Sequence, residues 1–225
     1  MRKARKLQII ITVIFLSGLA WFYATYRSIT LPDTIILKDK NPSTTAYIER
    51  FKERNPKVKV QWMWVSYGKI SSNLKEAVLA AEDDEFFEHK GFNVEAIKKA
   101  VIYDWKKKKF ARGASTITQQ LARNLYLTPS KNPVRKIKEL LISLKLEREL
   151  SKQRILELYL NVVEWGKGIY GCEAAARHYF NKSAAGLNAA ESAFLASILP
   201  SPRRLGKRNP NYLTPKAERI KSIID

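Results

Sequence analysis

The stretch from Glu82 to Gly91 holds a dense group of side chains that could do acid–base chemistry. It contains five carboxylates and one of the two histidines of a 225-residue chain whose formal net charge is +20. The apolar run from Leu74 to Ala81 precedes it, so we expect the acidic stretch where a helix ends. A carboxylate that is partly buried there gains the raised pKa that a general base needs. A solvated acidic helix end is the alternative, and the ligand spacing of a calcium-binding EF-hand loop is absent.

A second candidate segment is residues 113–127. Ser115 is expected to cap a helix, and Ile117, Leu121 and Leu125 recur at a spacing that turns one apolar stripe toward a core. The polar side chains that fall on the other faces are Thr116, Gln119, Gln120, Arg123 and Asn124. Free N–H groups and hydroxyls at such a helix start favour an anion site, although an ordinary capped amphipathic helix also fits.

The third candidate is a carboxylate with two cations beside it. Asn132 can cap a helix, and Pro133 suits its first position. Glu139 follows Arg135 by four positions and Lys136 by three, so both cations can reach its carboxylate on one helix face. Such neighbours keep a carboxylate ionised. The alternative is a surface salt-bridge ladder, which contributes little energy.

A fourth segment, residues 151–166, predicts a capped helix with a broad apolar face and by itself indicates core. Together the four segments resemble the glycosyltransferase family that polymerises peptidoglycan from lipid II, whose domain also forms the front half of bifunctional penicillin-binding proteins. The family patterns E-D-x-x-F-x-x-H-x-G, G-[GA]-S-T-I-T-Q-Q, R-K-x-x-E and I-L-E-x-Y-L-N occur in the family's order at residues 82–91, 113–120, 135–139 and 155–161. Four ordered matches are far more specific than one.

The resemblance extends from Trp64 to the C-terminus, with a weaker fifth block at residues 174–182 that continues to Leu199-Pro200. Glu164-Trp165-Gly166 and the early C-terminus resemble the monofunctional branch, which implies no transpeptidase activity. The implied fold is mainly α, a lysozyme-like glycosyltransferase domain with a small membrane-associated lobe, preceded by one transmembrane helix.

The N-terminus independently predicts a membrane anchor. Residues 7–26 contain no charged side chain, and as a helix they would span roughly 30 Å of hydrocarbon. The basic residues before this run indicate that the N-terminus stays inside the cell. A cleaved signal peptide is the alternative, but the run is long and Trp21-Phe22-Tyr23 follows Ala20 directly. We therefore expect a basic cytoplasmic N-terminus at 1–6, a transmembrane anchor at 7–26, a membrane-proximal segment at 27–60 and the peptidoglycan glycosyltransferase domain at 61–225.

The positive charge is concentrated at Lys106–Lys109 and Arg112 and again from Lys131 to Lys138. Net charge alone permits nucleic-acid binding, but beside an anchor it favours anionic lipid head groups and a pyrophosphate-linked substrate, so no nucleic acid is expected. Residues 100–110, which mix cations with aromatic rings, are expected to dip into the membrane surface. The single cysteine, Cys172, excludes an internal disulfide framework.

The resemblance implies a role for each site residue. Glu82 would be the base that deprotonates the acceptor sugar's 4-hydroxyl. Glu139 would be the second catalytic carboxylate, positioning the pyrophosphate directly or through a divalent cation, Mg²⁺ or Mn²⁺, with no organic cofactor. Arg123, Arg135 and Lys136 would supply positive charge. The residues expected to line the donor site with hydrogen bonds are Ser115, Thr116, Gln119, Gln120 and Asn124. The remaining residues of the expected substrate-binding set are Asp83, Phe86, His89 and Gly91.

Within that set, His89 is expected to brace its loop and Phe86 to pack. Two residues depart from the common family pattern: Ala114 stands where many relatives have a second glycine, and Arg123 stands where many have lysine. Arginine keeps the charge and adds a planar, bidentate geometry.

The implied reaction inverts the donor's anomeric carbon, forms β-1,4-linked glycan strands and releases undecaprenyl pyrophosphate. The implied partners are lipid II, the growing glycan chain, the bilayer, and cell-wall synthases and division proteins. The implied location is the bacterial cytoplasmic membrane, crossed once, with the catalytic domain outside. Two other classes stay open: a glycan-cleaving enzyme, because lysozyme-like folds also serve hydrolysis, and a non-catalytic scaffold of cell-wall assembly.

Overall fold

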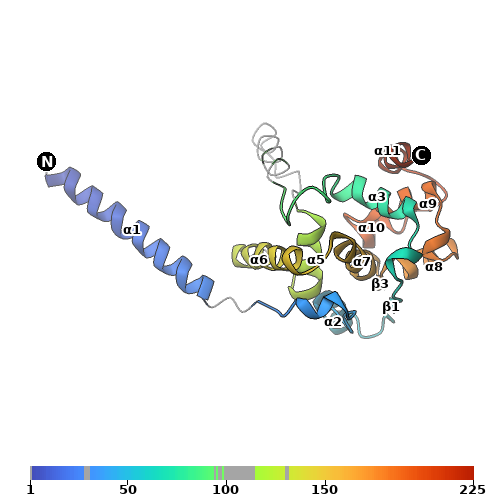
Figure 1. The fold of residues 1–225 in the computed structure, drawn as a ribbon, viewed down its shortest axis with the longest axis horizontal. Coiled ribbons are helices and arrows are strands. Elements are labelled where there is room, and N and C mark those ends of the chain that lie inside the picture. Colours follow the sequence, from blue (N-terminus) through green and yellow to red (C-terminus); the bar gives the residue numbers. More distant parts are fainter. Residues whose placement is uncertain (1, 28–30, 94, 96–97, 99–114, 130–131) are drawn as a thin grey trace. The chain divides into compact units, whose positions relative to one another are not determined.

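The computed structural model describes residues 2–27, 31–93, 95, 98, 115–129 and 132–225. The chain divides into two compact units, Met1–Pro32 and Asp33–Asp225 (Figure 1). Residues 33–60, which the sequence assigns to a membrane-proximal segment, lie in the second unit. The predicted membrane-surface segment at 100–110, its Lys106–Lys109 run, Arg112, Ala114 and Lys131 lie outside the described residues.

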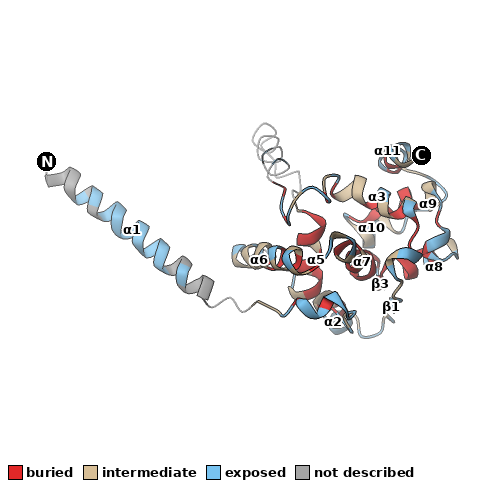
Figure 2. Ribbon diagram, viewed as in Figure 1, coloured by how far each residue is buried: buried red, intermediate tan, exposed pale blue. Residues whose placement is uncertain are grey.

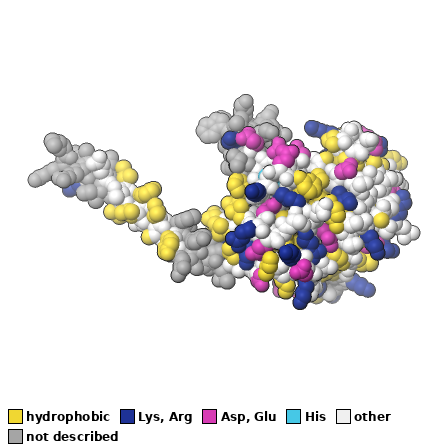
Figure 3. Space-filling view, in the orientation of Figure 1, with side chains coloured by type: hydrophobic (Ala, Val, Ile, Leu, Met, Phe, Trp, Pro, Cys, Tyr) yellow, Lys and Arg dark blue, Asp and Glu magenta, His cyan; other side chains and the backbone are white. Residues whose placement is uncertain are grey.

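The first unit consists mainly of one helix, α1 (Arg2–Arg27). Its described side chains from Ile10 to Leu19 are exposed, and the hydrophobic ones run along the helix (Figure 3). Within the described part of the chain, no helix is long and apolar enough to cross a membrane. The structure thus does not support the predicted transmembrane anchor at 7–26. The helix starts at Arg2, so the basic residues predicted as a separate tail belong to it.

The second unit begins with two short helices and a strand. They are η1 (Ile35–Lys38), α2 (Ala46–Arg54) and β1 (Gln61–Trp62), followed by η2 (Tyr67–Lys69) and α3 (Ser72–Glu82). The Thr45 hydroxyl caps α2 by accepting from the Ile48 N–H. Ile48 and Phe51 pack on Tyr170 in a buried cluster, which explains why this region is part of the compact unit.

The remaining described elements are mostly helices. They are α5 (Ile117–Tyr126), α6 (Pro133–Glu149), α7 (Lys152–Val162), β2 (Glu164–Gly166), β3 (Ile169–Tyr170), α8 (Cys172–Phe180), η3 (Ala184–Gly186), α9 (Ala189–Ile198), α10 (Pro202–Leu205) and α11 (Pro215–Ile224). The prediction of a mainly α fold is confirmed. The strand order is β1-β3-β2, with β1 parallel and β2 antiparallel to β3. Strand β1 is only two residues long.

The core of the second unit lies around α7 and α9. Helix α5 packs against α6 and α7, while α3 packs against α9 and α11. Figure 2 shows buried residues along α5, α7 and α9. Tyr159 of α7 and Trp165 of β2 are among the largest fully buried side chains. This packing fixes α3 and α5, the two helices that carry the first two candidate segments.

Local capping agrees with the sequence at three helices and differs at one. Asn132 and Ser151 cap α6 and α7, and Asn188 forms with Glu191 the capping box that their residue types and spacing favour at α9. Helix α5 is capped by Thr116 and not by the predicted Ser115. The Thr116 hydroxyl accepts from the Gln119 N–H, which leaves Ser115 available for a contact with α6.

Candidate active site

Glu82 is the last residue of α3, and its side chain is partly exposed. The Gln120 amide nitrogen donates to Glu82 Oε2 at 2.9 Å. The Gln120 amide oxygen in turn accepts from the Tyr159 hydroxyl at 3.1 Å, so a fully buried tyrosine orients the amide. Burial raises the pKa of the Glu82 carboxyl, and the Gln120 hydrogen bond partly opposes that rise. The predicted general base is therefore a partly exposed carboxylate with a raised pKa, held by one amide donor.

Asp83 holds the loop after α3 against the start of α5. Its Oδ2 accepts from the Ile117 N–H at 2.9 Å, and both of its oxygens lie 2.9–3.0 Å from His89 Nε2. The Gly91 N–H donates to His89 Nδ1 at 3.2 Å, which places the imidazole proton on Nε2. The Thr116 hydroxyl also donates to the Gly91 carbonyl, at 2.8 Å. His89 thus braces the loop, as its position in the sequence suggested.

Gly91 closes this loop in a conformation that favours glycine. Its φ is +90°, and a Cβ at this position would lie 3.2 Å from Glu147 Cγ. Phe86 is fully buried, and Lys152 Nζ lies 4.4 Å from the centre of its ring. Lys152 also pairs with Glu147 at 2.8 Å. Phe86, like the buried Asp83, makes the contacts of a supporting residue and has little or no surface for a substrate.

The second predicted carboxylate, Glu139, is fully buried on α6. Its two oxygens accept from Arg135 Nη1 and Lys136 Nζ, as the spacing predicted. Lys136 Nζ also donates to Ser115 Oγ at 2.9 Å and to Gln119 Oε1 at 3.2 Å. We call Arg135, Lys136 and Glu139 the cationic cluster. It carries more positive than negative charge and lies against the start of α5, where a helix N-terminus already favours an anion.

Arg123 of α5 links the two parts of the site electrostatically. Burial raises the pKa of both Glu82 and Tyr47, and the charge of Arg123 partly opposes the rise at each, with Arg135 also opposing it at Tyr47. The Arg123 Nε is buried and has no hydrogen-bond partner among the described residues. Asn124, the next residue, is buried on the same helix. Arg123 is thus a cation that the described part of the protein leaves uncommitted.

The sequence analysis missed three residues of this site. Tyr159 orients Gln120, and Tyr47 lies within electrostatic range of both Arg123 and the cationic cluster. Burial raises the pKa of Glu82, and Lys216 of α11 partly opposes that rise. Tyr159 is the tyrosine of the I-L-E-x-Y-L-N pattern, so a signal existed for it. Tyr47 and Lys216 lie in segments without a recognised pattern.

A protein-held metal does not fit the cationic cluster. Both oxygens of the predicted ligand Glu139 are engaged by cations. Within the described ranges, no three histidine, cysteine or acidic side chains come close enough to hold a metal ion.

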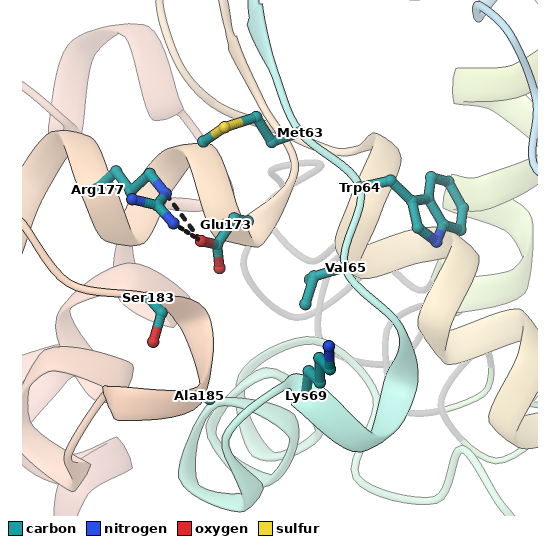
Figure 4. A pocket seen from close by; sticks show the side chains of 8 residues that line it. All are labelled: Met63, Trp64, Val65, Lys69, Glu173, Arg177, Ser183 and Ala185. Carbon is teal, nitrogen blue, oxygen red and sulfur yellow. Dashed lines mark hydrogen bonds and ion pairs between the residues drawn. The ribbon is translucent and has the colours of Figure 1, made fainter.

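A cavity of about 560 Å³ lies between the β1–η2 segment and α8, and it is separate from the site formed by Glu82 and the cationic cluster. Figure 4 shows Met63, Lys69 and Arg177 around it. Glu173, which also lines it, accepts from Arg177 Nε and from the Ala184 N–H, both at 2.8 Å. Lys69 precedes α3 while Glu82 ends it, so the two places are separated by a helix roughly 16 Å long. None of the predicted site residues lines this cavity.

Comparison with known proteins agrees with this geometry. A family model described as Transglycosylase matches residues 21–224. A protein of Aromatoleum aromaticum named biosynthetic peptidoglycan transglycosylase is 48% identical over 186 residues, covering 81% of this chain and 81% of that protein. Proteins of the same name from Bordetella avium and Nitrosospira multiformis are 50% and 46% identical, covering 74% and 80% of this chain and 71% and 80% of their own lengths. The chain therefore belongs to the transglycosylase family, and it is a peptidoglycan glycosyltransferase.

Proposed function

We propose that this enzyme polymerises lipid II into β-1,4-linked glycan strands, releases undecaprenyl pyrophosphate and inverts the donor's anomeric carbon, with no transpeptidase activity. The observation that carries the proposal is the pairing of a carboxylate whose pKa is raised by burial with a separate group of cations. A sugar hydroxyl is a weak nucleophile and needs a base, while a departing diphosphate needs positive charge. Glu82 would supply the base, and Arg135, Lys136 and Arg123 would supply the positive charge.

On the acceptor side, Glu82 takes the proton from the attacking 4-hydroxyl. Its carboxylate is partly exposed, so a substrate can reach it, and Gln120 holds one of its oxygens in place. A base with a raised pKa accepts the proton more readily as the new glycosidic bond forms. The other oxygen, Oε1, is the atom that we assign to the proton transfer.

On the donor side, Arg135, Lys136 and Arg123 stabilise the negative charge of the leaving diphosphate. Glu139 neutralises part of the charge of Arg135 and Lys136 and fixes their positions, so the cations are oriented before the substrate arrives. The Ser115 hydroxyl, which contacts Lys136, completes the donor side, and the buried Gln119 helps to hold Lys136 in place. Any divalent cation, Mg²⁺ or Mn²⁺, would come with the diphosphate and not from protein carboxylates.

The substrate's prenyl chain places the reaction at a bilayer. The exposed apolar side chains of α1, among them Ile14, Phe15 and Leu19, support association of the first unit with lipid. In this proposal the enzyme works at the outer face of the bacterial cytoplasmic membrane, where cell-wall synthases and division proteins are its partners.

The test is a polymerisation assay with detergent-solubilised full-length protein, labelled lipid II and a divalent cation, with products resolved by size. The wild type is expected to give a ladder of uncrosslinked glycan strands. Glu82→Gln should reduce the rate by at least about a hundredfold, the lower end for loss of a general base. Asp84→Asn, which neutralises an exposed carboxylate two positions away, is the matched control and should keep most activity.

A Glu82→Gln variant within about tenfold of the wild type would show that the base is misassigned, because such a loss is smaller than general-base catalysis supplies. Unchanged lipid II with folded wild-type protein would contradict the proposed reaction itself. Release of soluble fragments from purified cell walls would favour glycan cleavage instead.

A further inference from the structure

A second cavity, of about 270 Å³, lies beside α2. Its lining includes three arginines, one carboxylate and two aromatic rings: Arg50, Arg54, Arg203, Glu164, Tyr47 and Phe51. None of these residues belongs to the predicted catalytic or substrate-binding set. We call this cavity the arginine pocket, and it needs a physical explanation because guanidinium groups repel one another at close range.

The sequence of α2 directs its cations into one place. Tyr47, Arg50, Phe51 and Arg54 are spaced i, i+3, i+4 and i+7, so they share one helix face. Phe51 anchors this face in the core cluster with Ile48 and Tyr170. Arg50 and Arg54 are therefore held beside each other, and like charges at this spacing destabilise a helix.

The single carboxylate of the pocket does not neutralise these two arginines. Arg203 Nε donates to Glu164 Oε1 at 2.7 Å, and the Arg203 guanidinium lies 5.1 Å from the centre of the Phe51 ring. Arg50 Nε is buried and has no hydrogen-bond partner in the described part of the chain. A buried donor left without a partner destabilises the folded protein. A group that accepts from Arg50 and offsets the charge of Arg54 would remove both costs.

The chemistry of such a group follows from the donors and the space. Arginine forks match the oxygens of phosphate in bidentate geometry. The volume equals that of about nine liquid water molecules, which suits a phosphate or diphosphate and falls below the range of sites for larger organic ligands. We propose that the arginine pocket binds a phosphate group, either of an anionic lipid head group or of a soluble diphosphate.

The pocket is distinct from the cationic cluster but adjoins the same tyrosine. Burial raises the pKa of the Tyr47 phenol. Arg123 and Arg135 oppose this rise, while Glu139 and Glu164 of the pocket add to it. Tyr47 thus stands between two groups of cations, one assigned to the donor diphosphate and one without an assigned ligand. The proposal concerns the second group and does not depend on which reaction the first performs.

The test uses full-length protein and compares two double variants of equal charge change. Arg50→Gln/Arg54→Gln removes the uncommitted cations of the pocket. Lys52→Gln/Lys57→Gln removes two exposed cations from α2 and the turn after it, outside the pocket lining. Binding of sodium pyrophosphate is measured by calorimetry, and binding to phosphatidylcholine vesicles with and without phosphatidylglycerol by co-sedimentation. Arginine side-chain NMR, assigned with Arg50→Lys, follows the Arg50 Nε–H directly.

We expect the Arg50→Gln/Arg54→Gln variant to lose at least about tenfold in affinity for one phosphate ligand, while the lysine control stays within about twofold. The Arg50 Nε–H signal should shift when that ligand is added to the wild type. Loss confined to phosphatidylglycerol vesicles identifies a lipid head group, and loss confined to pyrophosphate identifies a soluble diphosphate. Equal losses in both double variants, no saturable binding by the wild type, or an Arg50 signal that does not move would each overturn the proposal.

Discussion

The hydrogen bond from Gln120 to Glu82 should set the pH at which the enzyme loses activity on the acid side. This bond favours the ionised carboxylate and so lowers the pKa of Glu82 against the rise caused by burial. Gln120→Met keeps the size of the side chain but removes the donor. The pKa of Glu82 should then rise further. Because the ionised form is the active base, activity should be lost at a higher pH as the solution is acidified.

The magnitude follows from the nature of the bond. A hydrogen bond to a charged group contributes about 1.5–3 kcal/mol, and 1.36 kcal/mol corresponds to one pKa unit. Water can replace part of the lost bond, because Glu82 is partly exposed. We therefore expect the acid limb of the kcat/KM profile to move up by about one pH unit. Tyr159→Phe, which leaves the amide in place but removes the hydroxyl that orients it, should move the limb in the same direction by less.

The assay is lipid II polymerisation by full-length protein across the pH range, with stability measured at each pH. Asp84→Asn serves as the control, because it neutralises an exposed neighbour and leaves the Glu82–Gln120 contact intact. An acid limb that stays in place in Gln120→Met, or that moves to lower pH, would refute the assignment of Glu82 as the base tuned by Gln120.

Three further predictions concern stability. Glu139→Gln leaves Arg135 and Lys136 without their carboxylate. Because these cations are 20% and 48% exposed, we expect the low end of the range for breaking a buried pair, about 3 kcal/mol, or about 6–12 °C in Tm by calorimetry, whereas Glu49→Gln in an exposed pair should leave the Tm nearly unchanged. Gly91→Ala should cost about 1–2 kcal/mol in urea unfolding because of its positive φ, whereas Gly68→Ala, where a Cβ meets nothing within 4 Å, should not. Chelation with EDTA should leave the Tm of the enzyme as purified unchanged, because the described residues form no metal-ion site, and a clear fall in Tm would reveal one.

The sequence predicted those features of the site that depend on local spacing. The contacts of Arg135 and Lys136 with Glu139 follow from positions one helical turn apart, and the caps at Asn132 and Ser151 follow from residue type. The prediction that Ser115 caps α5 was wrong, because both Ser115 and Thr116 have a residue type that can cap a helix. The choice is made by the Gly91 carbonyl, which accepts from Thr116 and comes from a loop 25 positions earlier.

Long-range contacts could not be predicted from spacing. The Tyr159 hydroxyl meets an amide 39 positions away, and no periodicity indicates such a meeting. Helix α2 was missed for a different reason. On the helix face where an apolar stripe would be expected, Arg50 and Arg54 alternate with the aromatic residues Tyr47 and Phe51. The segment therefore has the composition of a polar linker although it packs into the core.

The carboxylates of residues 82–91 make different contacts, and these differences support our proposal that Glu82 is the base. Asp83 is committed to the Ile117 N–H and to His89, and Glu85 accepts from the Asn93 amide at 2.6 Å. Asp84 and Glu88 are exposed to water. Glu82 combines burial, which raises its pKa, with a single neutral donor, which orients it while leaving one oxygen for a substrate. Asp83 and Glu85 thus support the loop beside the proposed base, so part of the acidic clustering in this strongly basic chain has a structural reason.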